Sequence, residues 1–225
     1  MTQEQQNQEP SQKEDKVQPI VDFGSVITKT DHGNVCCITI VGQIEGHNAA
    51  GERVKTTKYE HMLPMLVKLE QSCEVDGIIF LLNTVGGDIE AGLAIAELVA
   101  SMKKPTVSLI LGGSHSIGVP LAVATDRSFA VPSAAMTIHP VRMSGTVIAA
   151  PQTYQYFQRL QDRIVEFVTR HCEITPKRFE ELMLTKGDMA SDVGSVLYGA
   201  EAVKEGIVDQ EGGLGEALGW LHKQM

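Results

Sequence analysis

Short runs of apolar residues recur along the chain and alternate with segments of helical spacing. Each run has the length of a strand, is rich in branched side chains and is bounded by turn-forming residues, which is typical of buried strands. Gly42 is expected to end the first strand, and Gly112-Gly113 to form a turn after the third. The predicted strands are Val35–Val41, Gly77–Leu82, Thr106–Leu111, Ser128–Val131 and Ala135–Ile138.

Helical patterns fill the gaps between these strands. Thr57-Lys-Tyr-Glu60 is typical of a capping box and precedes apolar residues at helical spacing, although Pro64 removes one backbone hydrogen bond or kinks that helix. Asp88 is expected to cap a second helix, which Pro105 ends, and a helix of small residues is predicted over Ser116–Ala124. Strands and helices in strict alternation predict an α/β fold with parallel strand pairs and right-handed crossovers.

The C-terminal part begins with a long amphipathic helix, predicted over Gln152–Cys172. Thr175-Pro176 is expected to cap a shorter helix, and the two helices are predicted to form a projecting appendage. The remaining predicted elements are a helix over Ala200–Glu205 closed by Gly206, a short strand at Ile207–Val208, and a terminal helix through Leu214, Leu218 and Leu221.

The composition places these elements in one domain with a polar tail. The chain has 225 residues, of which 43% are hydrophobic and 21% charged, enough to bury one full core. Met1–Gln18 contains six glutamines and four acidic residues, too polar to repay the entropy of ordering. Residues 1–18 are therefore predicted to be a disordered tail, and residues 19–225 to form the domain.

Charge and hydropathy exclude several classes of protein. The net charge is -9 and no basic cluster offsets it, so nucleic acid is not an expected partner. No apolar run approaches the roughly 20 residues needed to cross a bilayer, and the N-terminus has no signal-peptide pattern, so we expect a cytoplasmic protein without membrane insertion. Cysteine and histidine spacings do not suggest zinc, and we expect neither a metal nor a cofactor. Buried thiols are expected at Cys36, Cys37, Cys73 and Cys172.

Two glycine-rich turns each follow a strand and open a helix. In the first, Asn83-Thr-Val-Gly-Gly-Asp88, the glycines permit close backbone approach, and the helix start presents unpaired N–H groups toward negative charge. Such a turn suits an oxyanion. It lacks the third glycine of a dinucleotide loop and the Gly-Lys-Ser/Thr of a P-loop, so a phosphate ligand is not expected. An ordinary strand-to-helix connection is the alternative.

The second turn, Gly112-Gly-Ser-His-Ser-Ile-Gly118, places Ser116 between small residues at the mouth of a helix. Ser116 is the candidate nucleophile, because a hydroxyl exposed there lies beside the N–H of the next residue, which can donate to an oxyanion. The alternative is a plain helix cap at Ser116 or Ser114.

His139 is the candidate general base. It follows the strand Ala135–Ile138 and precedes Pro140, which places it at a strand end, where a base that faces a cleft can take the serine proton. An incidental loop histidine is the alternative. His115 is nearer to Ser116 in sequence, but neighbouring side chains at a helix start diverge, so it ranks below His139.

Five motifs follow one another in consistent order and spacing over about residues 35–209. They are Ile40-Val-Gly-Gln-Ile-Glu45, Leu82-Asn-Thr-Val-Gly-Gly87, Gly112-Gly-Ser-His-Ser-Ile-Gly118, Met136-Thr-Ile-His-Pro140 and Glu201-Ala-Val-Lys-Glu-Gly-Ile-Val-Asp209. This order resembles the Clp protease proteolytic-subunit family of the ClpP/crotonase superfamily. Five ordered motifs are much more specific than any one of them.

The resemblance implies a ClpP/crotonase-like spiral of βαβ units with a projecting helical handle at about residues 152–172. It implies a serine peptidase in which Ser116 is the nucleophile, His139 is the general base, and the N–H groups of Gly87 and Ile117 form the oxyanion hole. Closed double rings of identical subunits, stacked through the handle, are also implied. Docking of a Clp-type ATPase is not expected, because the polar tail and the connection Gly46–Thr57 do not match the family's axial-loop and first-helix pattern.

The acidic member of the triad is where this sequence departs from the family. An ungapped alignment back from Glu201 puts Ala190 at the family's usual acidic position. We expect Asp192 to orient His139, with Asp188 as the alternate; without either carboxylate the tautomer of His139 is less well fixed and activity is low. Other functions stay open: a crotonase-type acyl-CoA enzyme, a catalytically silent ring subunit or scaffold, and a Ser/Lys dyad using Lys103, Lys104 or Lys177.

Overall fold

The computed structural model describes residues 25–51, 53–142, 148–189 and 192–225, so the predicted tail, Met1–Gln18, lies outside the described residues. The strands are β1 (Ser25–Thr30), β2 (Gly33–Glu45), β3 (Thr56–Lys58), β4 (Gly77–Gly87), β5 (Thr106–Ser114), β6 (Arg127–Ala130), β7 (Ala135–Ile138), β8 (Lys186–Met189), β9 (Asp192–Val193), β10 (Ser195–Tyr198) and β11 (Gln210–Glu211). The helices are α1 (Tyr59–Gln71), α2 (Ile89–Ala100), α3 (Gly118–Val123), α4 (Ala150–His171), α5 (Pro176–Leu184), α6 (Gly199–Lys204) and α7 (Leu214–Leu221).

The main sheet is mixed, with a parallel centre. Its strands follow the order β1-β2-β4-β5-β6-β11; β1 is antiparallel to β2, and the later pairs in this order are parallel. The strand β7 joins the end of β5 and pairs with β10 in antiparallel fashion. The predicted α/β fold is confirmed, and because β2, β4 and β5 run the same way, their carboxyl ends meet at one edge of the sheet.

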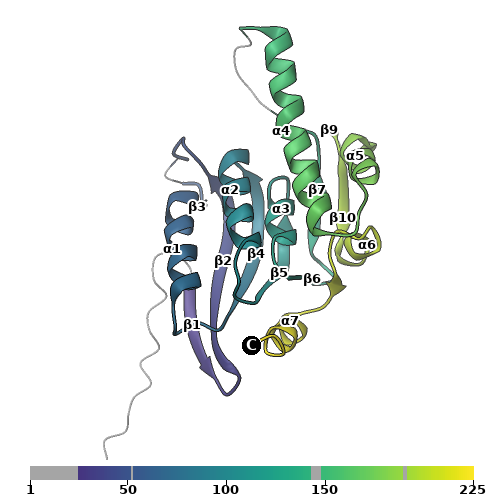
Figure 1. Ribbon diagram of the computed structural model, residues 1–225. Helices are drawn as coiled ribbons and strands as arrows, with labels where there is room; N and C mark the ends of the chain where they lie inside the picture. Colours follow the sequence, from purple (N-terminus) through teal and green to yellow (C-terminus); the bar gives the residue numbers. More distant parts are fainter. Residues whose placement is uncertain (1–24, 52, 143–147, 190–191) are drawn as a thin grey trace, which may run out of the picture.

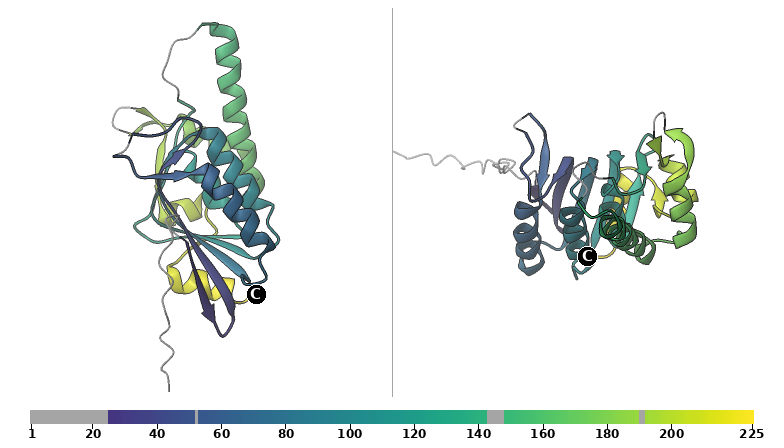
Figure 2. Two further views of the ribbon diagram at one scale, coloured as in Figure 1. Left: turned by 90° about the vertical axis from the view of Figure 1, so that its left-hand side faces the viewer. Right: turned by 90° about the horizontal axis from the view of Figure 1, so that it is seen from above.

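Helices cover both faces of this sheet. The helices α1, α2 and α3 lie on one face, and α7 lies on the other (Figures 1 and 2). The larger core includes Ile38 and Phe80 from the sheet and Ile95 from α2. The smaller core places Ile79, Val107, Leu109 and Phe129 against Ala217 and Leu221 of α7. Successive residues of β4 thus enter opposite cores, as the alternation of side chains along a strand requires.

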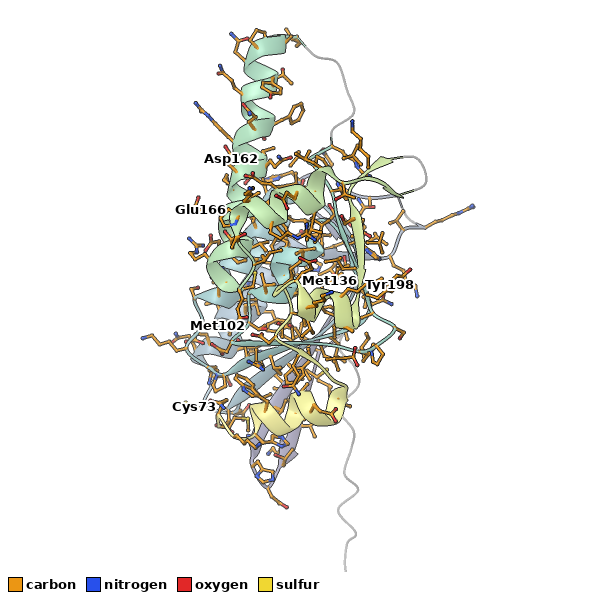
Figure 3. All side chains as sticks on the ribbon, turned by 90° about the vertical axis from the view of Figure 1, so that its right-hand side faces the viewer. Cys73, Met102, Met136, Asp162, Glu166 and Tyr198 are labelled. Atoms are coloured by element: carbon orange, nitrogen blue, oxygen red, sulfur yellow. The ribbon has the colours of Figure 1, made fainter. Side chains whose placement is uncertain are left out.

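The long helix α4 leaves the body of the molecule. Its first turns project beyond the sheet, while the part that carries Asp162 and Glu166 runs alongside the body (Figures 1 and 3). The buried residues of α4 lie in this second part: Leu160, Ile164, Val165, Phe167 and Val168. The helix spans Ala150–His171, close to the predicted range of 152–172. No helix in the described part of the chain is both long enough and apolar enough to span a bilayer.

Two predictions about local structure are wrong at the N-terminal side of α1. The predicted capping box fails, because Thr57 lies in β3 and its hydroxyl bonds the N–H and the carbonyl of Val41, each at 3.0 Å. Lys58 is the N-cap, without a side-chain hydrogen bond. Gly42 does not end β2, which continues to Glu45 through an irregularity after Gly42.

Three further predictions are wrong. Gly112-Gly113 is not a turn, since β5 continues to Ser114. The last strand lies at Gln210–Glu211 rather than at Ile207–Val208. Of the cysteines expected to be buried, Cys36 is buried, Cys37 and Cys172 are partly buried, and Cys73 is exposed, as its position at the edge of the molecule in Figure 3 shows.

Candidate active site

Ser116 lies in the connection between β5 and α3. Its φ is 56°, and it is the only non-glycine residue with positive φ in the described part of the chain. This left-handed conformation costs about 1–2 kcal/mol for a residue with a Cβ, and such strain is typical of a nucleophile elbow. The turn is fixed by its backbone, because the Ser116 N–H donates to the carbonyl of Thr137 at 2.8 Å and its carbonyl accepts from Val119 at 3.0 Å.

The first glycine turn lies directly against this serine. Gly86 has φ +85°, and a Cβ on it would lie 2.6 Å from the His115 carbonyl oxygen and 2.8 Å from the Ser116 Cβ. The Thr84 hydroxyl accepts from the Gly86 N–H at 3.1 Å and donates to the Gly42 carbonyl at 2.7 Å. Glycine is therefore required at position 86 both for its backbone conformation and for the close approach of the two turns.

Gly87 and Asp88 connect β4 to α2. Gly87 has φ +152°, and a Cβ there would overlap the backbone of Ile44 on the neighbouring strand. The predicted helix cap is confirmed, since a carboxylate oxygen of Asp88 accepts from the Ala91 N–H at 2.9 Å. On the other turn Ile117, the residue after Ser116, is buried, and a Cβ on Gly92 of α2 would overlap its side chain. The helix α2, which follows the first glycine turn, thus packs against the residue that follows Ser116 in the second turn.

His139 follows the last residue of β7. Its ring nitrogen Nδ1 lies 2.7 Å from the carbonyl oxygen of Pro140. A carbonyl oxygen only accepts, so Nδ1 carries the hydrogen of this bond. In the neutral ring the other nitrogen, Nε2, then carries no hydrogen, which is the tautomer that a general base for a serine needs.

A cavity of about 400 Å³ brings these residues together. Gly87, Ser116 and His139 all line it, although they come from the ends of three different strands. The lining combines apolar and polar side chains. Its apolar residues, called the apolar wall below, include Val119, Ile138, Leu160, Ile164, Phe179 and Met183, and its polar residues also include Asp88, Glu90, Arg142 and Tyr156. The sequence predicted α4 and α5 as a projecting appendage, but only the first turns of α4 project, and the rest of α4 together with α5 contributes to this wall (Figure 1).

His115 lies beside the cavity but does not line it. Its Nδ1 is 2.8 Å from the hydroxyl oxygen of Thr137. Burial lowers the pKa of His115, and the charge of His139 lowers it further. Sequence reasoning missed Thr137, because its contact with His115 joins two residues that lie 22 positions apart in the chain.

The two candidate carboxylates lie in a small hairpin. Asp188 belongs to β8 and Asp192 to β9, and these two strands pair with each other. Their side chains, like the whole of Ala190, lie outside the described residues. The acidic member of the triad therefore stays a prediction.

The fold and the cavity define an α/β protein of the ClpP/crotonase type, with a serine and a histidine at the carboxyl ends of adjacent strands. The family model described as Clp protease matches residues 34–211, and the chain belongs to this family. The resemblance found in the sequence is thereby confirmed, and membership implies a peptidase of the ClpP type.

Several curated proteins are similar to this chain. Translocation-enhancing protein TepA of Halalkalibacterium halodurans is 53% identical over 192 residues, which cover 85% of this chain and 75% of that protein. ATP-dependent Clp protease proteolytic subunit 1 of Chlamydia caviae is 27% identical over 136 residues, or 56% of this chain and 71% of that protein. The ATP-dependent Clp protease proteolytic subunit of Deinococcus radiodurans is 25% identical over 164 residues, or 71% and 76%.

Proposed function

We propose that this protein is a serine peptidase that hydrolyses peptide bonds in cytoplasmic proteins or peptides through an acyl-enzyme. The observation that carries the proposal is the shared cavity: Ser116 and His139 line it together, and the serine is held in the strained turn that exposes a nucleophile. The apolar wall formed with α4 and α5 suits an apolar side chain of the substrate next to the bond that is cleaved.

The reaction follows from the roles of these groups. Nε2 of His139 takes the Ser116 proton as the serine oxygen attacks the substrate carbonyl, and the N–H groups of Gly87 and Ile117 hold the oxyanion. The protonated histidine then gives its proton to the leaving amine, and water releases the acyl group by the same steps. Asp192, with Asp188 as the alternate, is the proposed carboxylate that orients His139, and it would accept the Nδ1–H that the Pro140 carbonyl accepts in this structure.

The protein is further proposed to assemble into a ring of identical subunits, as members of this family typically do. The projecting turns of α4 are the proposed contact between two stacked rings, with the cavities inside (Figure 1). Docking of a Clp-type ATPase is not part of the proposal.

Fluorophosphonate labelling tests the proposed nucleophile. Peptide mapping of the labelled protein is expected to place the phosphonate on Ser116, and Ser116→Ala is expected to abolish it. Ser101→Ala is the matched control, because Ser101 is an exposed serine at the C-terminal end of α2, and it is expected to label like the wild type. Labelling at another serine, or equal labelling of Ser116→Ala, would refute the assignment.

A second candidate function is a catalytically silent ring subunit. It is favoured by the name of the relative with 53% identity, which describes enhancement of translocation and mentions no peptidase. This candidate predicts a native assembly that does not degrade unfolded casein. Casein turnover that disappears in Ser116→Ala would exclude it. The crotonase-type alternative gains no support, since the matching family model is that of Clp proteases.

A further inference from the structure

The residue before the proposed nucleophile is a histidine with a defined environment. The Nδ1 atom of His115 is 2.8 Å from the Thr137 hydroxyl oxygen. On its other side the ring covers Gly113, where a Cβ would lie 2.6 Å from the ring carbon Cδ2 and would also overlap Nε2. The His115 N–H donates to the Thr84 carbonyl at 3.1 Å. The ring is therefore held between β5 and β7, and its backbone is held by β4.

Thr137 is bonded to both residues of the serine turn. Its carbonyl accepts the Ser116 N–H at 2.8 Å, while its hydroxyl is paired with His115. Thr137 also lies on the strand that ends one residue before His139. The pair His115–Thr137 thus joins the turn that carries the proposed nucleophile to the strand that carries the proposed base.

The surroundings of His115 disfavour its protonated form. Burial and the charge of the neighbouring His139 both lower the pKa of His115. The groups that contact it from β4 and β7, the Thr84 carbonyl and the Thr137 hydroxyl, are neutral. A proton on His139 therefore disfavours a second proton on His115, and the neutral His115 ring pairs with the Thr137 hydroxyl through Nδ1 in either tautomer, as acceptor or as donor.

We propose that His115 and Thr137 are positioning residues, whose side-chain hydrogen bond holds the Ser116 turn in register with His139. The proposal rests on the proposed function for the roles of Ser116 and His139. Neither positioning side chain lines the cavity, so substrate contact is not their role. Their effect is on the distance and direction between the serine oxygen and the imidazole of His139.

A double-mutant cycle tests the proposal on the full-length protein. His115→Ala and Thr137→Val are each expected to slow fluorophosphonate labelling of Ser116 by about five- to tenfold, the value of one hydrogen bond. The double variant is expected to label no more than about tenfold more slowly than the wild type, because both changes remove the same hydrogen bond. Losses that multiply, to about 25- to 100-fold in the double variant, would overturn the proposal.

Conservative variants separate positioning from general damage to the fold. Asn in His115→Asn can still reach the Thr137 hydroxyl, and Thr137→Ser keeps that hydroxyl, so both are expected to label within about twofold of the wild type. Gly113→Ala keeps both bonding groups but displaces the ring, and is expected to behave like His115→Ala. Labelling that is slowed about five- to tenfold in both conservative variants, with melting temperatures unchanged, would contradict the inference.

A readout that does not need activity distinguishes this inference from the proposed function. In protein with ¹³C-labelled histidine rings, the resonance of His115, assigned by its loss in His115→Asn, is expected to shift in Thr137→Val. The pKa of His115 is expected to rise in His139→Gln, because the like charge is removed. Wild-type protein that does not label would refute the proposed function alone, whereas a His115 resonance unmoved in Thr137→Val would refute the inference alone.

Discussion

At the scale of single residues, Gly86 is the residue whose size sets the position of Ser116. A Cβ at this position would meet both the His115 carbonyl and the Ser116 side chain, in a backbone conformation that alanine rarely adopts. Gly86→Ala is expected to lower the free energy of unfolding by about 1–3 kcal/mol and to slow fluorophosphonate labelling by at least about tenfold. Urea unfolding and labelling kinetics measure the two effects.

Gly219 in α7 provides the matched control for this prediction. A Cβ on Gly219 meets nothing within 4 Å, and alanine is favoured over glycine in a helix. Gly219→Ala is expected to raise the free energy of unfolding by about 0.5–1 kcal/mol and to leave labelling unchanged. Wild-type stability and wild-type labelling in Gly86→Ala would contradict the packing of the two turns.

Residue roles were predictable from the sequence only where they depend on neighbours in the chain. The cap formed by Asp88 was predicted correctly because it bonds Ala91, three residues away. The contact of His115 with Thr137 was not, because it joins two strands 22 residues apart. The sequence named glycine at position 86 as a turn residue, but the closeness of Ser116 follows only from the folded arrangement.

At the scale of elements, two ion pairs connect α2 to α4. Arg163 donates to both carboxylate oxygens of Glu90, at 2.6 and 3.0 Å, and Arg170 donates to Glu97 at 2.8 Å. The side chains of Arg163 and Glu90 are 48% and 46% exposed, so water screens the pair. Arg163→Met is therefore expected to lower the free energy of unfolding at neutral pH by no more than about 1 kcal/mol.

The pH dependence of this effect has a definite sign. The hydrogen bond from Arg163 lowers the pKa of Glu90 from its ordinary value of 4.5. Stabilisation by the pair is thus complete above pH 4.5 and is lost as the pH falls through the lowered pKa of folded Glu90. Urea unfolding from neutral to acid pH is expected to show the wild type and Arg163→Met converging. Arg159→Met, on the exposed face of α4, is the control, and a difference that grows in acid would contradict the prediction.

Periodicity predicted the types of the elements. It did not predict the end of a strand where a glycine lies inside that strand. Gly42 and Gly112 were expected to end strands, and both lie within them. A Cβ on Gly112 would lie 2.5 Å from the Asn83 side chain, and one on Gly42 would overlap the Lys55 carbonyl. These glycines make room for a neighbouring strand or loop, which a single strand's sequence does not show.

At the scale of the whole molecule, the fold and the family were predictable because five motifs keep their order and spacing over most of the chain. The fold then brings the proposed site residues together through parallel strands that end at one edge. Assembly is different, since it depends on surfaces that a single chain leaves exposed. The projecting turns of α4 are such a surface.

Tyr154 tests whether α4 joins two rings. It is 63% exposed on the projecting part of α4, and an aromatic ring buries about 150–250 Å² when a partner covers it. Tyr154→Glu would place like charges in that contact, so native mass spectrometry is expected to show half the wild-type mass, still a multiple of 24.4 kDa. Val67→Glu, at a 53% exposed position on α1, is the control and is expected to keep the wild-type mass. An unchanged mass in Tyr154→Glu would exclude a role for these turns, and a halved mass in Val67→Glu alone would place the contact on α1.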